Sequence, residues 1–139
     1  MIKTERAYKR ALEDLETQQN HIHNERKRFE DIGLTEDQIQ QALEPLHSFK
    51  DLIKEEISFY ESATNGEFPA TIQLSEIGVY LIAYRIYKGI NQSELATKLN
   101  VLQSQVARDE KNEYYGASIE KMVNVMKAIG MEAELTIIS

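Results

Sequence analysis

The chain has 139 residues, which is enough for one domain with an appendage or for two small units. Hydrophobic residues make up 42% and charged residues 28%, as in a soluble folded protein, and the lack of cysteine excludes disulfides and thiolate metal sites. The net charge of −7 has the wrong sign for a protein that holds nucleic acid through its overall charge.

The first predicted element is a long amphipathic helix over residues 4–31. This segment contains no Pro and no Gly and is rich in residues that favour helices. Its apolar residues recur every seven positions, as in a coiled coil: Tyr8, Leu15, Ile22 and Phe29. Because this stripe is narrow, the helix should be stable only when it packs against another element. We expect Gly33 to end it.

A second helical region follows, and Thr35 and Gln38 have the spacing of a capping box at its start. Its apolar residues lie at helical spacing: Ile39, Leu43, Leu46, Phe49, Ile53, Ile57 and Tyr60. Because Pro45 interrupts the pattern, we expect a short helix over 36–43, a break, and a longer helix over 45–61. The long helices predict an antiparallel hairpin over residues 1–63, which a second chain could extend to a four-helix assembly.

Metal and enzyme chemistry find little support in the sequence. The histidines His21, His23 and His47 all fall on the predicted hairpin, and residues two apart on a helix point in different directions. There is no Gly-rich phosphate loop and no cysteine nucleophile. We therefore expect no metal site, no cofactor and no enzymatic activity.

Residues 64–73 are predicted to form a linker, because they contain the Asn-Gly and Phe-Pro pairs typical of turns. The second unit, residues 74–139, should begin with a helix over 75–88 that ends at Gly89. Its inward residues should be Ile77, Leu81, Ile82 and Ile86.

A last helix is expected between Ser118, as its N-cap, and Gly130. Its predicted core residues are Ile119, Met122, Val123, Met126 and Ile129. Beyond it, residues 131–137 alternate apolar and polar side chains, which predicts a short C-terminal strand. That strand should pair with residues 70–74 or with its copy in a second subunit, giving a two-fold dimer.

Between these helices, residues 91–110 contain two short helical patterns separated by three residues. Ala96 is small enough for a second helix to cross closely, and Asn100 tolerates the left-handed backbone of a tight turn. Apolar residues fall at Leu95, Leu99, Val101 and Val106. This layout is typical of a helix-turn-helix, whose second helix lies in the DNA major groove. Here the second helix should span about residues 103–109.

These residues resemble the helix-turn-helix of the lambda-repressor and Cro family, also called the xenobiotic-response-element family, over residues 74–129. The resemblance implies a mainly α fold in which a lambda-repressor-like domain follows the N-terminal hairpin. It also implies that Gln92 contacts a DNA phosphate and that Arg85 pairs with Glu110. The ion pair has independent support, because both residues lie on otherwise apolar patterns and would be costly to bury unpaired.

The chain departs from the family pattern in two ways. Asp109 stands where the family has an apolar residue, and we expect its charge to repel a nearby phosphate. Lys111 and Asn112 stand where the family has Gly, and Asn112 is expected to adopt the left-handed conformation. Tyr114 and Tyr115 are expected to pack in the following loop, with a phosphate contact from one hydroxyl as the alternative.

The predicted DNA contacts are polar side chains at the start of the second helix and cations around it. Gln can bond adenine, Arg can bond guanine, and Ser suits a base or a phosphate. The candidate residues are Gln92, Lys98, Gln103, Ser104, Gln105, Arg108 and Lys111.

The sequence therefore favours a dimeric, sequence-specific regulator that binds double-stranded DNA, most simply a repressor. The alternative is an antitoxin-like interaction module whose N-terminal helices hold a toxin or another protein, with or without DNA binding. A structural adaptor without DNA binding is the third possibility. No apolar run approaches a membrane span, and the opening residues lack a signal-peptide core, so the cytoplasm is the expected compartment.

Overall fold

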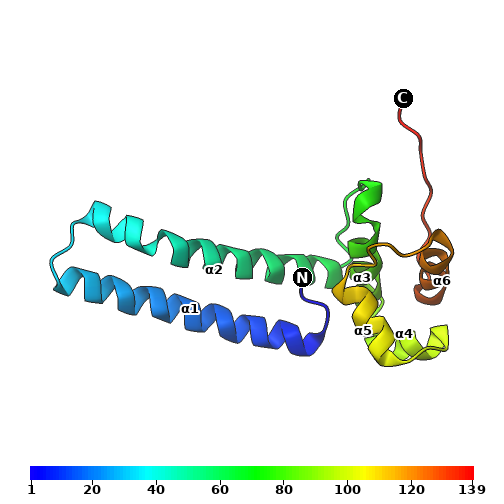
Figure 1. The fold of residues 1–139 in the computed structure, drawn as a ribbon, viewed down its shortest axis with the longest axis horizontal. Coiled ribbons are helices and arrows are strands. Elements are labelled where there is room, and N and C mark those ends of the chain that lie inside the picture. Colours follow the sequence, from blue (N-terminus) through cyan, green and yellow to red (C-terminus); the bar gives the residue numbers. More distant parts are fainter. The chain divides into compact units, whose positions relative to one another are not determined.

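The computed structural model describes residues 1–139, and the fold consists of six α-helices and one short 3₁₀ helix (Figure 1). The chain divides into two compact units, Met1–Tyr60 and Glu61–Ser139. No residue lies in a β-strand, so the protein is mainly α. None of its helices combines the length and the apolar character that crossing a bilayer requires.

The first unit is a hairpin of two long helices that lie side by side (Figure 1), α1 (Glu5–Asp31) and α2 (Glu36–Thr64). Thr4 caps α1 by accepting a hydrogen bond from the backbone N–H of Ala7 at 3.1 Å. At the start of α2, Thr35 and Gln38 exchange side-chain to backbone hydrogen bonds of 2.9 and 3.3 Å, which confirms the predicted capping box.

The core of the hairpin is formed by the predicted apolar stripes. Ile22 of α1 packs with Ile39 and Leu43 of α2, and the half-buried Phe29, Leu34 and Leu46 surround them. Toward the other end, the rings of Tyr8 and Tyr60 stack with their centroids 4.7 Å apart. The seven-residue repeat of α1 therefore faces α2 along the length of the hairpin.

The predicted break at Pro45 is wrong, because α2 continues through it. A proline inside a helix removes one backbone hydrogen bond and crowds the carbonyl four residues earlier. Here Pro45 and Gln41 are both exposed, so the Gln41 carbonyl that loses its donor can bond water. Leu43 and Leu46 pack into the hairpin core on either side of Pro45, and this packing holds the helix together.

The second unit contains the 3₁₀ helix (Leu74–Glu76) and four α-helices: α3 (Ile77–Tyr87), α4 (Gln92–Leu99), α5 (Gln103–Lys111) and α6 (Ile119–Ile129). α4 packs against α5 and α6, and α3 packs against α6. The largest fully buried apolar side chains of this unit come from all four α-helices: Leu81, Ile82, Leu95, Val106, Val125 and Ile129.

The segment expected to be a linker packs against α3. The Phe68 ring lies 6.5, 5.8 and 5.7 Å from the rings of Tyr80, Tyr84 and Tyr87, measured between centroids. Gly66 lies so close to Tyr87 that a Cβ there would come 2.6 Å from its ring. Aromatic contacts therefore tie the segment before the 3₁₀ helix to the second unit.

Two predictions for the end of the chain need correction. In α6, Ile119 and Val123 are 76% and 37% exposed, and Val125 is buried instead. Val123 and Val125 are two positions apart on a helix, so only one of them can face inward.

The predicted C-terminal strand is absent, because residues 131–139 have no regular secondary structure. A strand without a neighbour leaves its backbone N–H and C=O groups without ladder partners. Residues 70–74, the intrachain partner that the alternation suggested, do not pair with it.

Candidate nucleic-acid interface

The turn between α4 and α5 has the geometry that its residues favour. Asn91 caps α4 by accepting a hydrogen bond from the Glu94 backbone N–H at 2.8 Å. Asn100 adopts the left-handed conformation, with φ 57° and ψ 45°, as predicted. The Val101 N–H then bonds the Ala96 carbonyl at 3.0 Å, and Leu102 is extended, so α5 starts three residues after Asn100.

α5 has one buried face and one solvent face. Val106 and Glu110 are buried, whereas Gln105 is half-buried. On the solvent side the helix presents the predicted contact residues Gln103, Ser104, Arg108 and Lys111, and Lys98 is exposed at the end of α4. The amides and the hydroxyl at the start of α5, and the guanidinium of Arg108 in its last turn, are groups that can bond base edges or phosphates.

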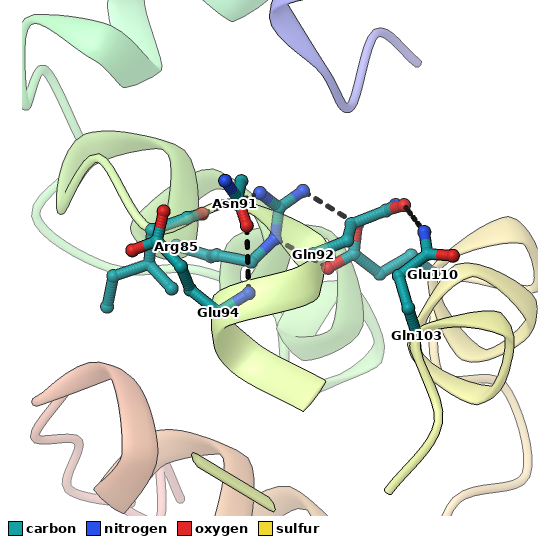
Figure 2. A network of polar contacts seen from close by, with 7 residues as sticks. Arg85, Asn91, Gln92, Glu94, Gln103 and Glu110 are labelled. Carbon is teal, nitrogen blue, oxygen red and sulfur yellow. Dashed lines mark hydrogen bonds and ion pairs between the residues drawn. The ribbon is translucent and has the colours of Figure 1, made fainter. Parts of the chain in front are cut away.

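Arg85 of α3 and Glu110 of α5 form a buried ion pair (Figure 2), with side chains 3% and 0% exposed. Arg85 Nε and Nη2 donate to the two carboxylate oxygens of Glu110 at 2.6 and 2.7 Å. Arg85 Nη1 also donates to the Ile90 carbonyl at 2.9 Å. Both charges are therefore matched, and no buried side-chain nitrogen or oxygen lacks a hydrogen-bond partner.

The ion pair continues into a row of amides that ends at the solvent face of α5. Gln92 Nε2 donates to Glu110 Oε1 at 2.9 Å, and Gln103 Nε2 donates to Gln92 Oε1 at 3.1 Å (Figure 2). Gln92 thus lies between Glu110 and Gln103 and is half-buried. A carboxylate only accepts hydrogen bonds, so Glu110 determines which way both amides point.

Asp109 has two partners that the sequence pattern did not indicate. Lys121 of α6 lies 2.7 Å from Asp109 Oδ2, and Gln105 Nε2 donates to Asp109 Oδ1 at 3.1 Å. The positive charge of Lys121 balances the negative charge of Asp109, from which we expected repulsion of a phosphate. Lys121 is twelve positions away on another helix, and no local signal links the two residues.

The loop after α5 differs from the sequence-based expectation. Asn112 has φ −90°, and Glu113 and Tyr114 instead adopt left-handed conformations. The Tyr114 N–H bonds the Asp109 carbonyl at 2.8 Å, and a Cβ at Gly78 would lie 1.8 Å from the Glu113 carbonyl oxygen. The loop therefore lies directly against α3, where only glycine leaves enough space.

Of the two loop tyrosines, Tyr114 packs inside the unit and Tyr115 is 94% exposed. Burial, and then the negative charges of Glu110 and Asp109, raise the pKa of the Tyr114 hydroxyl, which therefore stays neutral. Of these two tyrosines, only Tyr115 has a side chain that an external ligand can reach.

Comparison with known proteins adds no assignment. No protein-family model matches the chain, and searches of curated proteins and of solved structures gave no match.

Proposed function

We propose that the protein is a sequence-specific regulator that binds double-stranded DNA through a helix-turn-helix formed by α4 and α5. One observation carries the proposal: α5 follows a tight turn and buries one face while presenting Gln103, Ser104 and Arg108 to solvent. In a helix-turn-helix, residues at the start of the second helix contact base edges, and Gln103 and Ser104 occupy that place here, whereas Arg108 is exposed in the last turn.

The local charge supports this function better than the net charge does. Residues 64–139 contain seven basic and nine acidic side chains, a net charge of −2, and the ion pairs Arg85–Glu110 and Lys121–Asp109 remove two charges of each sign. Lys98 in the last turn of α4, and Arg108 and Lys111 in the last turn of α5, remain exposed. These cations suit phosphate contacts, so binding should weaken steeply as salt rises. A two-fold dimer would place two such helices on a palindromic site.

A gel-shift titration tests the proposal. The full chain is titrated against DNA from its own upstream region and against a random duplex, each at two salt concentrations. Arg108→Ala should weaken binding to the preferred DNA by roughly 1–3 kcal/mol. Lys127→Ala removes one exposed cation from the last turn of α6 and is the matched control. Equal effects of the two variants, or no binding to either DNA, would contradict the proposal.

A groove on the hairpin supports a second candidate function, which is an antitoxin-like interaction with another protein. The groove encloses about 510 Å³ and is lined by residues of both helices: Asp14, Thr17, Gln18, Phe49, Leu52, Ile53 and Glu56. Phe49 and Leu52 are large apolar side chains that are more than half exposed. Asp14 gives the groove negative charge, whereas Glu56 is paired with the N-terminal ammonium at 3.2 Å, so the partner should be a segment with apolar anchors and a flanking Lys or Arg.

Sedimentation of the full chain with synthetic basic amphipathic peptides tests this second function. The double variant Phe49→Ser, Leu52→Ser should abolish binding of any peptide that the wild type retains, and Leu12→Ser, on the same hairpin but outside the groove lining, is the control. Peptide binding that survives the double variant would exclude the groove.

A further inference from the structure

A relay of polar contacts runs from Lys121 of α6 through Asp109 to Gln105 of α5. Lys121 Nζ lies 2.7 Å from Asp109 Oδ2, and Gln105 Nε2 lies 3.1 Å from Asp109 Oδ1. The Asp109 side chain is 18% exposed and the Lys121 side chain 40% exposed, so the carboxylate is the more enclosed of the two. Each carboxylate oxygen therefore has its own cationic or N–H partner.

This relay determines the direction of the Gln105 amide. A glutamine amide can be turned either way, since its oxygen and nitrogen have nearly the same shape. The Asp109 carboxylate in its ion pair with Lys121 can only accept a hydrogen bond, so the amide must turn its N–H toward Asp109. The amide oxygen consequently points away from the carboxylate.

The oxygen of the Gln105 amide is available to a ligand. No side chain or backbone group of the chain bonds it, and no buried side-chain oxygen lacks a partner, so this atom is in contact with solvent. The amide also retains its second N–H. Gln105 therefore offers one acceptor beside one donor, with the acceptor oriented by Asp109.

We propose that Lys121 and Asp109 are positioning residues that make Gln105 select adenine in the major groove. Adenine presents an N6 amino donor beside the N7 acceptor, which complements an outward amide oxygen and the remaining N–H. Guanine and thymine present O6 and O4 acceptors, and cytosine has an amino donor without an adjacent acceptor. The inference rests on the proposed DNA-binding function and specifies the base that one residue reads.

Lys121 acts through Asp109 and contacts no base in this proposal. Without its ammonium group, the Asp109 carboxylate is freer to rotate toward water, and the Gln105 amide can turn its N–H outward toward guanine or thymine. Loss of Lys121 should thus relax the choice of base at one position. Any effect of losing Lys127, the other cation of α6, should be the same for all sequences.

The test is selection of bound duplexes from a library with a randomised centre, using the full-length wild type and variants. The base pair that faces Gln105 is the one whose preference disappears in Gln105→Ala. At that pair the wild type should enrich adenine, and replacing it by guanine in the selected duplex should weaken binding about 5- to 150-fold.

Three further variants separate positioning from general charge. Lys121→Met should relax the preference at the Gln105 pair and at no other. Lys127→Met removes the same charge from the same helix without touching Asp109 and should retain the preference. Lys121→Arg keeps a cation beside Asp109 and should show the same base preference as the wild type.

The remaining outcomes overturn the inference in distinguishable ways. Enrichment of a site with guanine, thymine or cytosine at the Gln105 pair would refute the amide direction. Unchanged preference in Lys121→Met, or no position that responds to Gln105→Ala, would refute the relay. No enriched duplex with the wild type would overturn the proposed DNA-binding function itself.

Discussion

Replacing Arg85 with alanine should destabilise the second unit severely. The substitution removes hydrogen bonds of 2.6 and 2.7 Å to Glu110 and one of 2.9 Å to the Ile90 carbonyl. Glu110 is 0% exposed, so its charge would stay buried with the Gln92 amide as its remaining donor. Breaking such a pair costs about 3–5 kcal/mol, a large part of the roughly 5–15 kcal/mol by which domains are stable.

The loss is measured by thermal and urea unfolding, and hydrogen exchange locates it in the chain. For a unit of this size, the melting temperature should fall by more than about 10 °C. The control is Arg28→Ala, which breaks an exposed Arg–Glu contact of 2.8 Å on α1 and should leave the melting temperature nearly unchanged.

A double variant separates the buried charge from lost packing. Arg85→Met with Glu110→Leu should recover most of the stability, because no unpaired charge remains in the core. If Arg85→Ala melts like the wild type, or like Arg28→Ala, the buried pair does not stabilise the unit and the reasoning is refuted.

Two further predictions concern the backbone of the second unit, and a third concerns an ion pair of the hairpin. Gly78→Ala should lower the melting temperature, because a Cβ would lie 1.8 Å from the Glu113 carbonyl oxygen, although this change usually favours a helix; a rise would contradict the close approach. Asn100→Val should cost about 1–2 kcal/mol in urea unfolding, because φ is 57° there, while Asn100→Gly should be tolerated; equal losses would argue against left-handed strain. A hydrogen bond from Arg26 lowers the pKa of the Glu36 carboxyl in the folded state. The contact therefore stabilises the hairpin at pH values above the unfolded-state pKa of Glu36. This stabilisation is lost as the pH falls through the lower folded-state pKa. The difference in melting temperature between wild type and Glu36→Gln should therefore shrink in acid, and a constant difference would exclude the linkage.

The candidate site shows where sequence reasoning succeeds. Asn100 could be assigned to the turn because the left-handed conformation restricts residue choice locally. Arg85 and Glu110 could be paired because an unmatched charge on an apolar helix face is too costly to bury. Both arguments depend on a strong penalty that few residue types can avoid.

The same reasoning fails where several arrangements cost nearly the same. Asp109 could be solvated, could repel phosphate or could pair with a cation, and only the packing of α6 brings Lys121 to it. The left-handed residues after α5 are Glu113 and Tyr114 rather than Asn112, because burial of Tyr114 against α3 offsets the backbone strain.

The sequence by itself determined the positions of the helices and the polar face of α5, since apolar spacing and capping act between residues close in the chain. The tertiary structure decided which face of α6 is buried, that α2 continues through Pro45, and that residues 131–139 form no strand. It also decided the orientation of the Gln103 amide, which follows from its hydrogen bond to Gln92. Those features depend on contacts between segments far apart in the chain, which local patterns do not record.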